Sequence, residues 1–222
     1  MSSEAQGKDQ RPIALTIAGS DSSAGAGIQA DLKAFSANGV YGLTALTCVV
    51  AEIPGRVSRI DPVDASLLGE QIRLLVEAFP VAAAKTGMLY SRTHIRAVTH
   101  DVPQRIPLVV DPVILASTGD PLLLPDAVEA YRTELLPRAT LITPNADEAG
   151  FLLDRKLETA EDLADAAQAL SRTFGTDVLV KGGHLASEVA TDALCVGGAT
   201  EMLEAPAVQG VDAHGTGCTF SA

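Results

Sequence analysis

The feature that most constrains the fold is a regular alternation of short apolar runs with amphipathic segments along nearly the whole chain. The runs that read as buried strands span residues 13–18, 43–51, 81–86, 107–111, 139–143 and 177–181. Fully apolar strands separated by helical segments are typical of a parallel sheet that helices cover on both faces. The sequence therefore predicts an α/β fold with a mostly parallel central sheet.

The segments between these runs carry helix signals. Apolar residues recur at helical spacing in residues 28–38, 64–79, 91–100, 125–136 and 159–175. Asp64 is placed to cap one helix, Pro125 suits a first helical turn, and Thr159 with Asp162 resembles a capping box. Near the C-terminus, residues 190–196 and 200–203 flank a Gly-Gly pair and predict an antiparallel hairpin.

The chain is expected to form one domain. No repeat, low-complexity tract or linker interrupts residues 12–222, and this length is sufficient for a single core. Residues 1–11 are polar and lack the apolar region of a secretory signal, so we expect a disordered tail there.

Charge and cysteine usage exclude several classes of protein. The formal net charge of −12 disfavours nucleic acid as a partner, because such a surface repels phosphate backbones. The longest apolar runs are too short to cross a membrane. The three cysteines are odd in number and form no CxxC pair, which favours a reducing, cytoplasmic location over a disulfide framework.

Glycines and ionisable groups follow most of the predicted strands. In parallel sheets, ligands bind beyond the carboxyl ends of the strands, so these groups are expected to converge on one site. They lie in residues 19–31, 85–88, 111–113, 143–148, 181–184 and 214–218.

The last of these stretches, His214-Gly-Thr-Gly-Cys218, is the most informative. Its glycines allow successive backbone N–H groups to face one point, and a helix starting there adds the positive end of its dipole. The pattern predicts an anion hole for a phosphoryl group in transfer. The Gly-rich residues 19–27 match no dinucleotide or P-loop motif and are weak evidence alone.

Seven motifs together resemble the hydroxymethylpyrimidine and hydroxymethylpyrimidine phosphate kinases of the ribokinase superfamily. They occur in the order of that family and span residues 12–222. They are Gly19-Ser-Asp-Ser-Ser with Gly25-Ala-Gly-Ile-Gln-Ala-Asp-Leu-Lys33, Lys85-Thr-Gly-Met-Leu89, Val109-Val-Asp-Pro-Val113, Gly119-Asp-Pro-Leu-Leu123, Ile142-Thr-Pro-Asn145 with Glu148, Lys181-Gly-Gly-His184 and His214-Gly-Thr-Gly-Cys-Thr219. The resemblance implies a ribokinase-like, three-layer α/β/α fold.

The resemblance also implies an activity. A kinase of this family uses ATP and Mg²⁺ to phosphorylate a small molecule, 4-amino-5-hydroxymethyl-2-methylpyrimidine or its monophosphate, in thiamine biosynthesis. Two alternatives stay open: a pyridoxine or pyridoxal kinase of the same fold, and a catalytically impaired protein that only binds the ligand. A homodimer is the oligomer that the resemblance implies.

The catalytic roles that the resemblance implies centre on the final motif. Cys218 stands where the wider superfamily has an Asp base, and a thiol near a helix N-terminus and a lysine is expected to have a lowered pKa. Gly215, Thr216 and Gly217 would supply the N–H groups of the anion hole, and Thr216 would also contact the nucleotide. Lys181 would reach the phosphates of ATP as a point charge.

The implied site also includes residues for the nucleotide, for Mg²⁺ and for the acceptor. Asn145 would help to bind the nucleotide, and Glu148 and Asp111 would organise Mg²⁺, largely through water. The residues expected to line the acceptor pocket are Gly19, Asp31, Glu52, Met88 and Val113. Glu52 departs from the family, which often has Gln there, and a carboxylate only accepts hydrogen bonds.

The end of the sequence also departs from the family pattern. The resemblance implies roughly one more helical pair after Cys218, whereas the sequence stops at Ala222. We therefore expect either that the domain is truncated at its C-terminus or that the protein has lost part of its ATP site. A chain extended by about 40 family-like residues is expected to be more stable and to bind ATP better.

Overall fold

A single mixed sheet of nine strands organises the computed structural model, which describes residues 11–114, 122–183, 189–208 and 214–222. The strand order is β3-β2-β1-β4-β5-β6-β7-β8-β9. The strands are β1 (Ile13–Asp21), β2 (Tyr41–Ile53), β3 (Arg56–Pro62), β4 (Val81–Thr86), β5 (Leu108–Val110), β6 (Leu141–Ile142), β7 (Asp177–Lys181), β8 (Val189–Val196) and β9 (Ala199–Pro206). Strands β2, β1, β4, β5, β6 and β7 are mutually parallel, and the outer strands are antiparallel.

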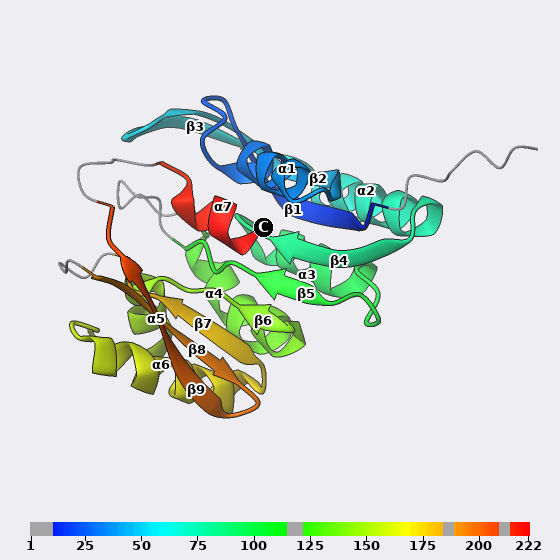
Figure 1. The fold of residues 1–222 in the computed structure, drawn as a ribbon. Helices are drawn as coiled ribbons and strands as arrows, with labels where there is room; N and C mark the ends of the chain where they lie inside the picture. The colour runs from blue at the N-terminus through cyan, green and yellow to red at the C-terminus, as the bar shows by residue number, and fades with distance from the viewer. Residues whose placement is uncertain (1–10, 115–121, 184–188, 209–213) are drawn as a thin grey trace, which may run out of the picture.

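Helices cover both faces of this sheet (Figure 1). They are α1 (Gly27–Ala37), α2 (Ala65–Ala78), α3 (Arg92–Asp101), α4 (Val128–Ala130), α5 (Ala146–Leu153), α6 (Ala160–Phe174) and α7 (Thr216–Ser221). Helices α1 and α7 pack together on one face, and α2 packs against α3 on the other. The fold is therefore the predicted three-layer α/β/α arrangement with a mostly parallel central sheet.

The order of the strands places a switch point at β1. The chain runs from β1 through α1 to β2 on one side, then returns through α2 to β4 on the other side of β1. Because parallel crossovers are right-handed, reversing the direction of travel puts α1 on the face opposite α2. Ligands bind at the carboxyl ends of strands next to such a point, here the ends of β1 and β4.

The predicted caps are confirmed. The Asp64 side chain accepts a hydrogen bond from the Ser66 N–H at 2.8 Å and begins α2. Thr159 and Asp162 form a reciprocal capping box at the start of α6, which ends at Gly175 in the left-handed conformation (φ +68°). These local signals fixed where both helices begin.

Two segments differ from the prediction. Residues 125–138 are helical as expected but irregular, passing from a 3-10 turn (Pro125–Ala127) through α4 to a π-helical stretch (Tyr131–Leu135) and a second 3-10 turn (Leu136–Arg138). Strand β3 was not predicted, because its sequence RVSRIDP is largely polar and pairs at the exposed edge of the sheet. The β8–β9 hairpin is confirmed.

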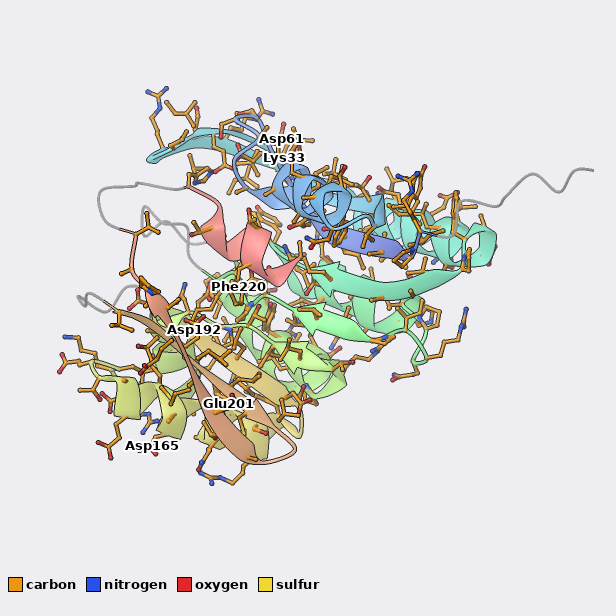
Figure 2. The ribbon with its side chains drawn as sticks, in the orientation of Figure 1. Lys33, Asp61, Asp165, Asp192, Glu201 and Phe220 are labelled. Carbon is orange, nitrogen blue, oxygen red and sulfur yellow. The ribbon has the colours of Figure 1, made fainter. Side chains whose placement is uncertain are left out.

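The main apolar core lies between the sheet and the helices, and it takes in the buried parts of β1, β4, β5, β6 and β7. Charged side chains such as those of Asp165 and Glu201 project outward from α6 and β9 (Figure 2). The described helices include none that is both long and apolar enough to span a bilayer. The predicted tail falls outside the described residues, except for Arg11.

Candidate active site

The ionisable groups that follow the parallel strands meet at one edge of the sheet. Lys181 ends β7, Asp111 follows β5 directly, and Asn145 bridges to Lys181 beyond the end of β6. Helix α7 and the turn before it lie over this edge, beside α1 (Figure 1). The convergence that the sequence predicted is therefore observed.

Asp111 is the centre of the network on the β5–β7 side. Its Oδ1 lies 3.2 Å from the Lys181 Nζ, and its Oδ2 accepts a hydrogen bond from the Ser221 Oγ at 3.0 Å. The Tyr131 hydroxyl donates to the Asp111 backbone carbonyl at 3.2 Å. Asp111 is 2% exposed, so this buried carboxylate joins β5, β7 and α7.

Asn145 and Glu148 hold one another in a capping box at the start of α5. The Glu148 N–H donates to the Asn145 side-chain oxygen at 2.8 Å, and the Asn145 N–H donates to the Glu148 Oε2 at 2.9 Å. Burial, and next the nearby Asp111 carboxylate, raises the pKa of Glu148 from 4.5 to about 8, against the opposing effect of Lys181. The site therefore holds two buried carboxyl groups near one lysine, and burial disfavours the ionised form of Glu148.

The glycine-framed turn at residues 215–217 packs backbone against backbone on the loop after β1. Gly215 has φ +84°, and a Cβ there would collide with the carbonyl of Gly25. A Cβ on Gly217 would lie 3.4 Å from the Lys181 Nζ and 4.0 Å from the Asp111 Oδ2. Gly217 therefore faces Lys181 and Asp111, and the space between its Cα and these two side chains is large enough for one methyl-sized group.

The Cys218 thiol is partly buried among groups of both signs. Burial, the largest influence, raises its pKa above the ordinary value of 9.0; the Lys85 ammonium lowers the pKa, while Asp111 and Asp31 raise it. The expectation of a lowered pKa is therefore wrong. Helix α7 has only six described residues before Ala222, and two carboxylates oppose the lysine.

Asp31 lies in a buried ion pair rather than at an open surface. Its Oδ1 is 2.5 Å from the Lys85 Nζ, and its Oδ2 accepts a hydrogen bond from the Thr16 Oγ1 at 2.5 Å. The Asp31 side chain is fully buried and that of Lys85 is 3% exposed. The Lys85 Nζ also lies 3.4 Å from the Cys218 carbonyl, so the pair connects α1 and β4 to α7.

A second apolar cluster, separate from the main core, lies at the ends of β1, β2 and β4. The Cys48 Sγ is 3.7 Å from the Met88 Sδ, and Val113 packs against the same cluster. A Cβ on Gly19 would lie 2.8 Å from the Cys48 Sγ and 3.6 Å from the Met88 Sδ. The structure therefore brings together three of the residues predicted to line the acceptor pocket: Gly19, Met88 and Val113.

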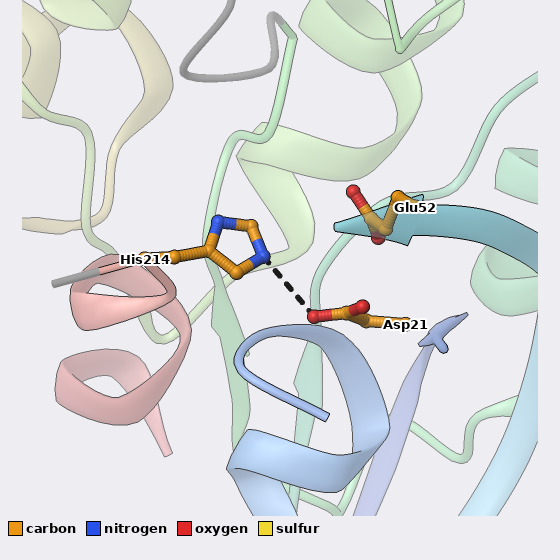
Figure 3. A group of neighbouring side chains, drawn as sticks. All are labelled: Asp21, Glu52 and His214. Atoms are coloured by element: carbon orange, nitrogen blue, oxygen red, sulfur yellow. Dashed lines mark hydrogen bonds and ion pairs between the residues drawn. The ribbon is translucent and has the colours of Figure 1, made fainter. Parts of the chain in front are cut away.

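Glu52 stands at the rim of this cluster. Successive side chains alternate along a strand, so Cys48, Val50 and Glu52 share one face of β2. Figure 3 shows Glu52 facing Asp21 and His214, and the His214 Nε2 lies 3.1 Å from the Asp21 Oδ2. Burial, followed by the Asp21 carboxylate, raises the pKa of Glu52.

Sequence reasoning assigned no role to two residues of this site. Lys85 was noted only as part of a motif, although a lysine in an otherwise apolar strand already signals a buried partner. Ser221 carried no signal, because its bond to Asp111 spans 110 positions of sequence. His94 on α3 is also buried, and its Nε2 lies 2.8 Å from the Val63 carbonyl.

Comparison with known proteins agrees with this geometry. The family model described as phosphomethylpyrimidine kinase matches residues 21–222. A hydroxymethylpyrimidine/phosphomethylpyrimidine kinase of Rhizobium meliloti is 45% identical over 213 residues, which cover 95% of this chain and 80% of that protein. A pyridoxine kinase of Bacillus subtilis is 40% identical, over 94% of this chain and 79% of that protein.

Solved structures give the same result. An ADP complex of pyridoxal kinase from Bacillus subtilis superimposes with a TM-score of 0.87 at 38% identity, covering 95% of this chain and 81% of that one. A phosphomethylpyrimidine kinase from Clostridium difficile gives a TM-score of 0.81 at 35% identity, covering 95% and 87%.

Proposed function

The chain belongs to the phosphomethylpyrimidine kinase family, and from this premise we propose that it transfers the γ-phosphoryl group of ATP to the hydroxymethyl group of a hydroxymethylpyrimidine or its monophosphate, in thiamine biosynthesis. The observation that carries the proposal is the meeting of Lys181, Asp111 and Gly217 at the start of α7. Phosphoryl transfer needs cations on the phosphates, donors for the migrating group and a fixed nucleophile, and this edge of the sheet offers each of them.

The nucleotide side is formed by Lys181 and the turn at residues 215–217. The Lys181 ammonium faces Gly217 across a space that a Cβ would partly fill, so a phosphate oxygen has room between them. Backbone N–H groups from the turn and from Thr216 would then donate to the migrating group, with Asn145 beside them. Donors fixed in advance stabilise charge that develops in the transition state.

Mg²⁺ fits the acidic side of this site. Asp111 and Glu148 are buried carboxyl groups near one lysine, and burial, followed by the Asp111 carboxylate, raises the pKa of Glu148 to about 8, so a bound cation would favour the ionised form of Glu148. Mg²⁺ prefers oxygen ligands and retains several waters, so these two groups would hold it directly or through water. When bound, the ion would neutralise charge on the phosphates.

The acceptor side is formed by the second apolar cluster. Gly19, Met88 and Val113 provide apolar contacts suited to a heterocycle, and Glu52 at the rim would accept hydrogen bonds from the ring edge. Asp31 is bound to Lys85 and Thr16 on both of its oxygens. We infer that Asp31 holds Lys85 near α7, in addition to any contact that Asp31 makes with the acceptor.

The Cys218 thiol lies near charged groups, since Lys85, Asp111 and Asp31 all influence its pKa. We infer that its thiolate accepts the proton of the acceptor hydroxyl, although the raised pKa leaves most of the thiol protonated at neutral pH. Proton transfer to a positioned base contributes about 10²–10⁴-fold to a rate. The base is therefore expected to act most strongly in alkaline solution.

A coupled assay of ADP release tests the proposed function. The purified protein is supplied with ATP, Mg²⁺ and, in separate reactions, hydroxymethylpyrimidine, its monophosphate, pyridoxine or pyridoxal. The proposal predicts the highest kcat/KM with one of the two pyrimidines. Tight binding of a pyrimidine by calorimetry with no release of ADP would instead indicate a protein that only binds the ligand.

A pyridoxine or pyridoxal kinase is the second candidate. The pyridoxine kinase relative at 40% identity and the pyridoxal kinase structure with a TM-score of 0.87 favour it. A higher kcat/KM with pyridoxine or pyridoxal than with either pyrimidine would establish it. The homodimer stays a prediction, and sedimentation velocity would test it.

A further inference from the structure

Three side chains outside the nucleotide side form a group with the donor set of a transition-metal site. Asp21 ends β1, Glu52 lies near the end of β2, and His214 precedes α7 (Figure 3). One ligand atom from each lies within 4.8 Å of the other two. Asp21 is 1% exposed and the other two are half-buried, so this is not a chance cluster on an open surface.

The spacing of two of these atoms already suits a metal. The His214 Nε2 and the Asp21 Oδ2 are 3.1 Å apart. Ligand atoms at about 2.0–2.2 Å from one zinc ion are separated by roughly 3–3.5 Å, which includes this distance. A cation bound between these atoms would replace their hydrogen bond. The Asp21 Oδ2 also accepts hydrogen bonds from the Ser23 Oγ at 2.9 Å, the Gly25 N–H at 3.0 Å and the Ala26 N–H at 2.8 Å, so the cation would compete with these three donors.

Glu52 provides the mobile third ligand. None of the described residues donates a hydrogen bond to its carboxylate, so no existing bond opposes its rotation toward the pair. Its backbone is held by Ser22, whose Oγ donates to the Glu52 carbonyl at 2.6 Å. The residue is thus fixed at its Cα and free at its carboxylate.

The charges at this site favour a cation. Asp21 and Glu52 each place a carboxylate oxygen within 4.8 Å of the other. Two carboxylates thus oppose each other with only His214 between them.

We propose that Asp21, Glu52 and His214 bind one divalent transition-metal ion of the zinc class, through the His214 Nε2 and one oxygen of each carboxylate. An imidazole with two carboxylates suits Zn²⁺ or Co²⁺ better than Mg²⁺, which prefers oxygen ligands and octahedral geometry. The bound ion cross-links the end of β1, the end of β2 and the turn before α7. This site is distinct from the Asp111–Glu148 group that is assigned to Mg²⁺.

Calorimetric titration with Zn²⁺ tests the proposal. The protein is first stripped of metals and then titrated in buffer that contains Mg²⁺ but neither nucleotide nor acceptor. We expect one Zn²⁺ per chain, and affinities lower by about tenfold or more in Glu52→Gln and in His214→Gln. Glu52→Gln keeps the shape of the side chain and disturbs no hydrogen bond of the carboxylate, so its folding is not at risk.

Matched control variants lie on exposed helix surfaces. Glu70→Gln on α2 and His100→Gln on α3 remove the same chemical groups elsewhere and should leave Zn²⁺ affinity unchanged. Substitution with Co²⁺ adds a direct readout, because visible bands of a histidine-ligated ion should appear in the wild type and be lost in His214→Gln. Absence of Zn²⁺ binding, or equal affinity in wild type and Glu52→Gln, would overturn the proposal, and a failed kinase assay would not affect it.

Discussion

Replacing Gly217 by alanine isolates the contribution of the first turn of α7. Gly217 has no positive φ, and the nearest atoms to an added Cβ would be the Lys181 Nζ at 3.4 Å and the Asp111 Oδ2 at 4.0 Å. Both distances are ordinary van der Waals contacts, so the methyl group fits the unliganded protein. It fills, however, the space that a phosphate oxygen needs between Lys181 and the amides of α7.

The two consequences of Gly217→Ala can be separated by magnitude. Alanine is favoured over glycine in a helix by up to about 1 kcal/mol, so the free energy of unfolding should stay equal or rise slightly. Loss of one donor contact to a transition state typically lowers kcat by about 10²–10³, and we expect a fall of that size here. Thermal unfolding and ADP release, measured on the same preparation, give both values.

Gly215→Ala is the contrasting variant. Its φ of +84° disfavours any L side chain, and its Cβ would collide with the Gly25 carbonyl, so the melting temperature should fall together with activity. Gly217→Ala should lose activity alone. Turnover by Gly217→Ala equal to that of the wild type would refute the placement of a phosphoryl group against this turn.

Three further predictions follow from the buried charges. Cys218→Ala should lower kcat by about 10²–10⁴-fold with little change in acceptor affinity. Because only the thiolate accepts a proton, kcat of the wild type should rise as the pH increases toward and beyond 9.0. Equal losses of kcat and of acceptor affinity in the variant would assign Cys218 to packing. Glu148 has a raised pKa in the folded state, so its ionisation destabilises the fold as the pH rises from 4.5 to about 8. Glu148→Gln keeps the capping box, and its free energy of unfolding should exceed that of the wild type by roughly 2–4 kcal/mol at pH 8 and equal it near pH 4.5. A stability difference in denaturant titrations that does not change with pH would contradict this. Lys85→Met leaves Asp31 buried without its cation and should lower the free energy of unfolding by about 3–5 kcal/mol in the same titrations. The double variant with Asp31→Leu should recover much of that free energy. No recovery would show that the pair acts through other contacts.

The layered fold could be predicted because its signals are local. The apolar runs of β1, β4 and β7 lie in the buried sheet, and the caps at Asp64 and Thr159 begin α2 and α6 as their side chains suggested. Strand β3 could not be predicted, because an exposed edge strand needs no apolar pattern and obtains its stability from pairing with β2.

The site could be predicted only in its membership. Gly19, Met88 and Val113 do meet, and Lys181 does reach Asp111. The raised pKa of Cys218 could not be predicted, because it depends first on burial and then on charges from several parts of the fold.

The Asp31–Lys85 pair was equally hidden. Its members are 54 positions apart, and Asp31 taken by itself has the sequence signature of an exposed helix carboxylate. Pairings of this kind are set by the topology of the sheet rather than by any local pattern.

The most direct test of the phosphoryl-transfer site is a crystal structure of the protein with hydroxymethylpyrimidine and a non-hydrolysable ATP analogue. The account predicts that the terminal phosphate lies within about 3 Å of the amides of residues 215–217 and near the Lys181 Nζ, with the acceptor hydroxyl directed at the Cys218 sulfur. A terminal phosphate bound away from that turn, or a Cys218 side chain facing away from the acceptor, would contradict it.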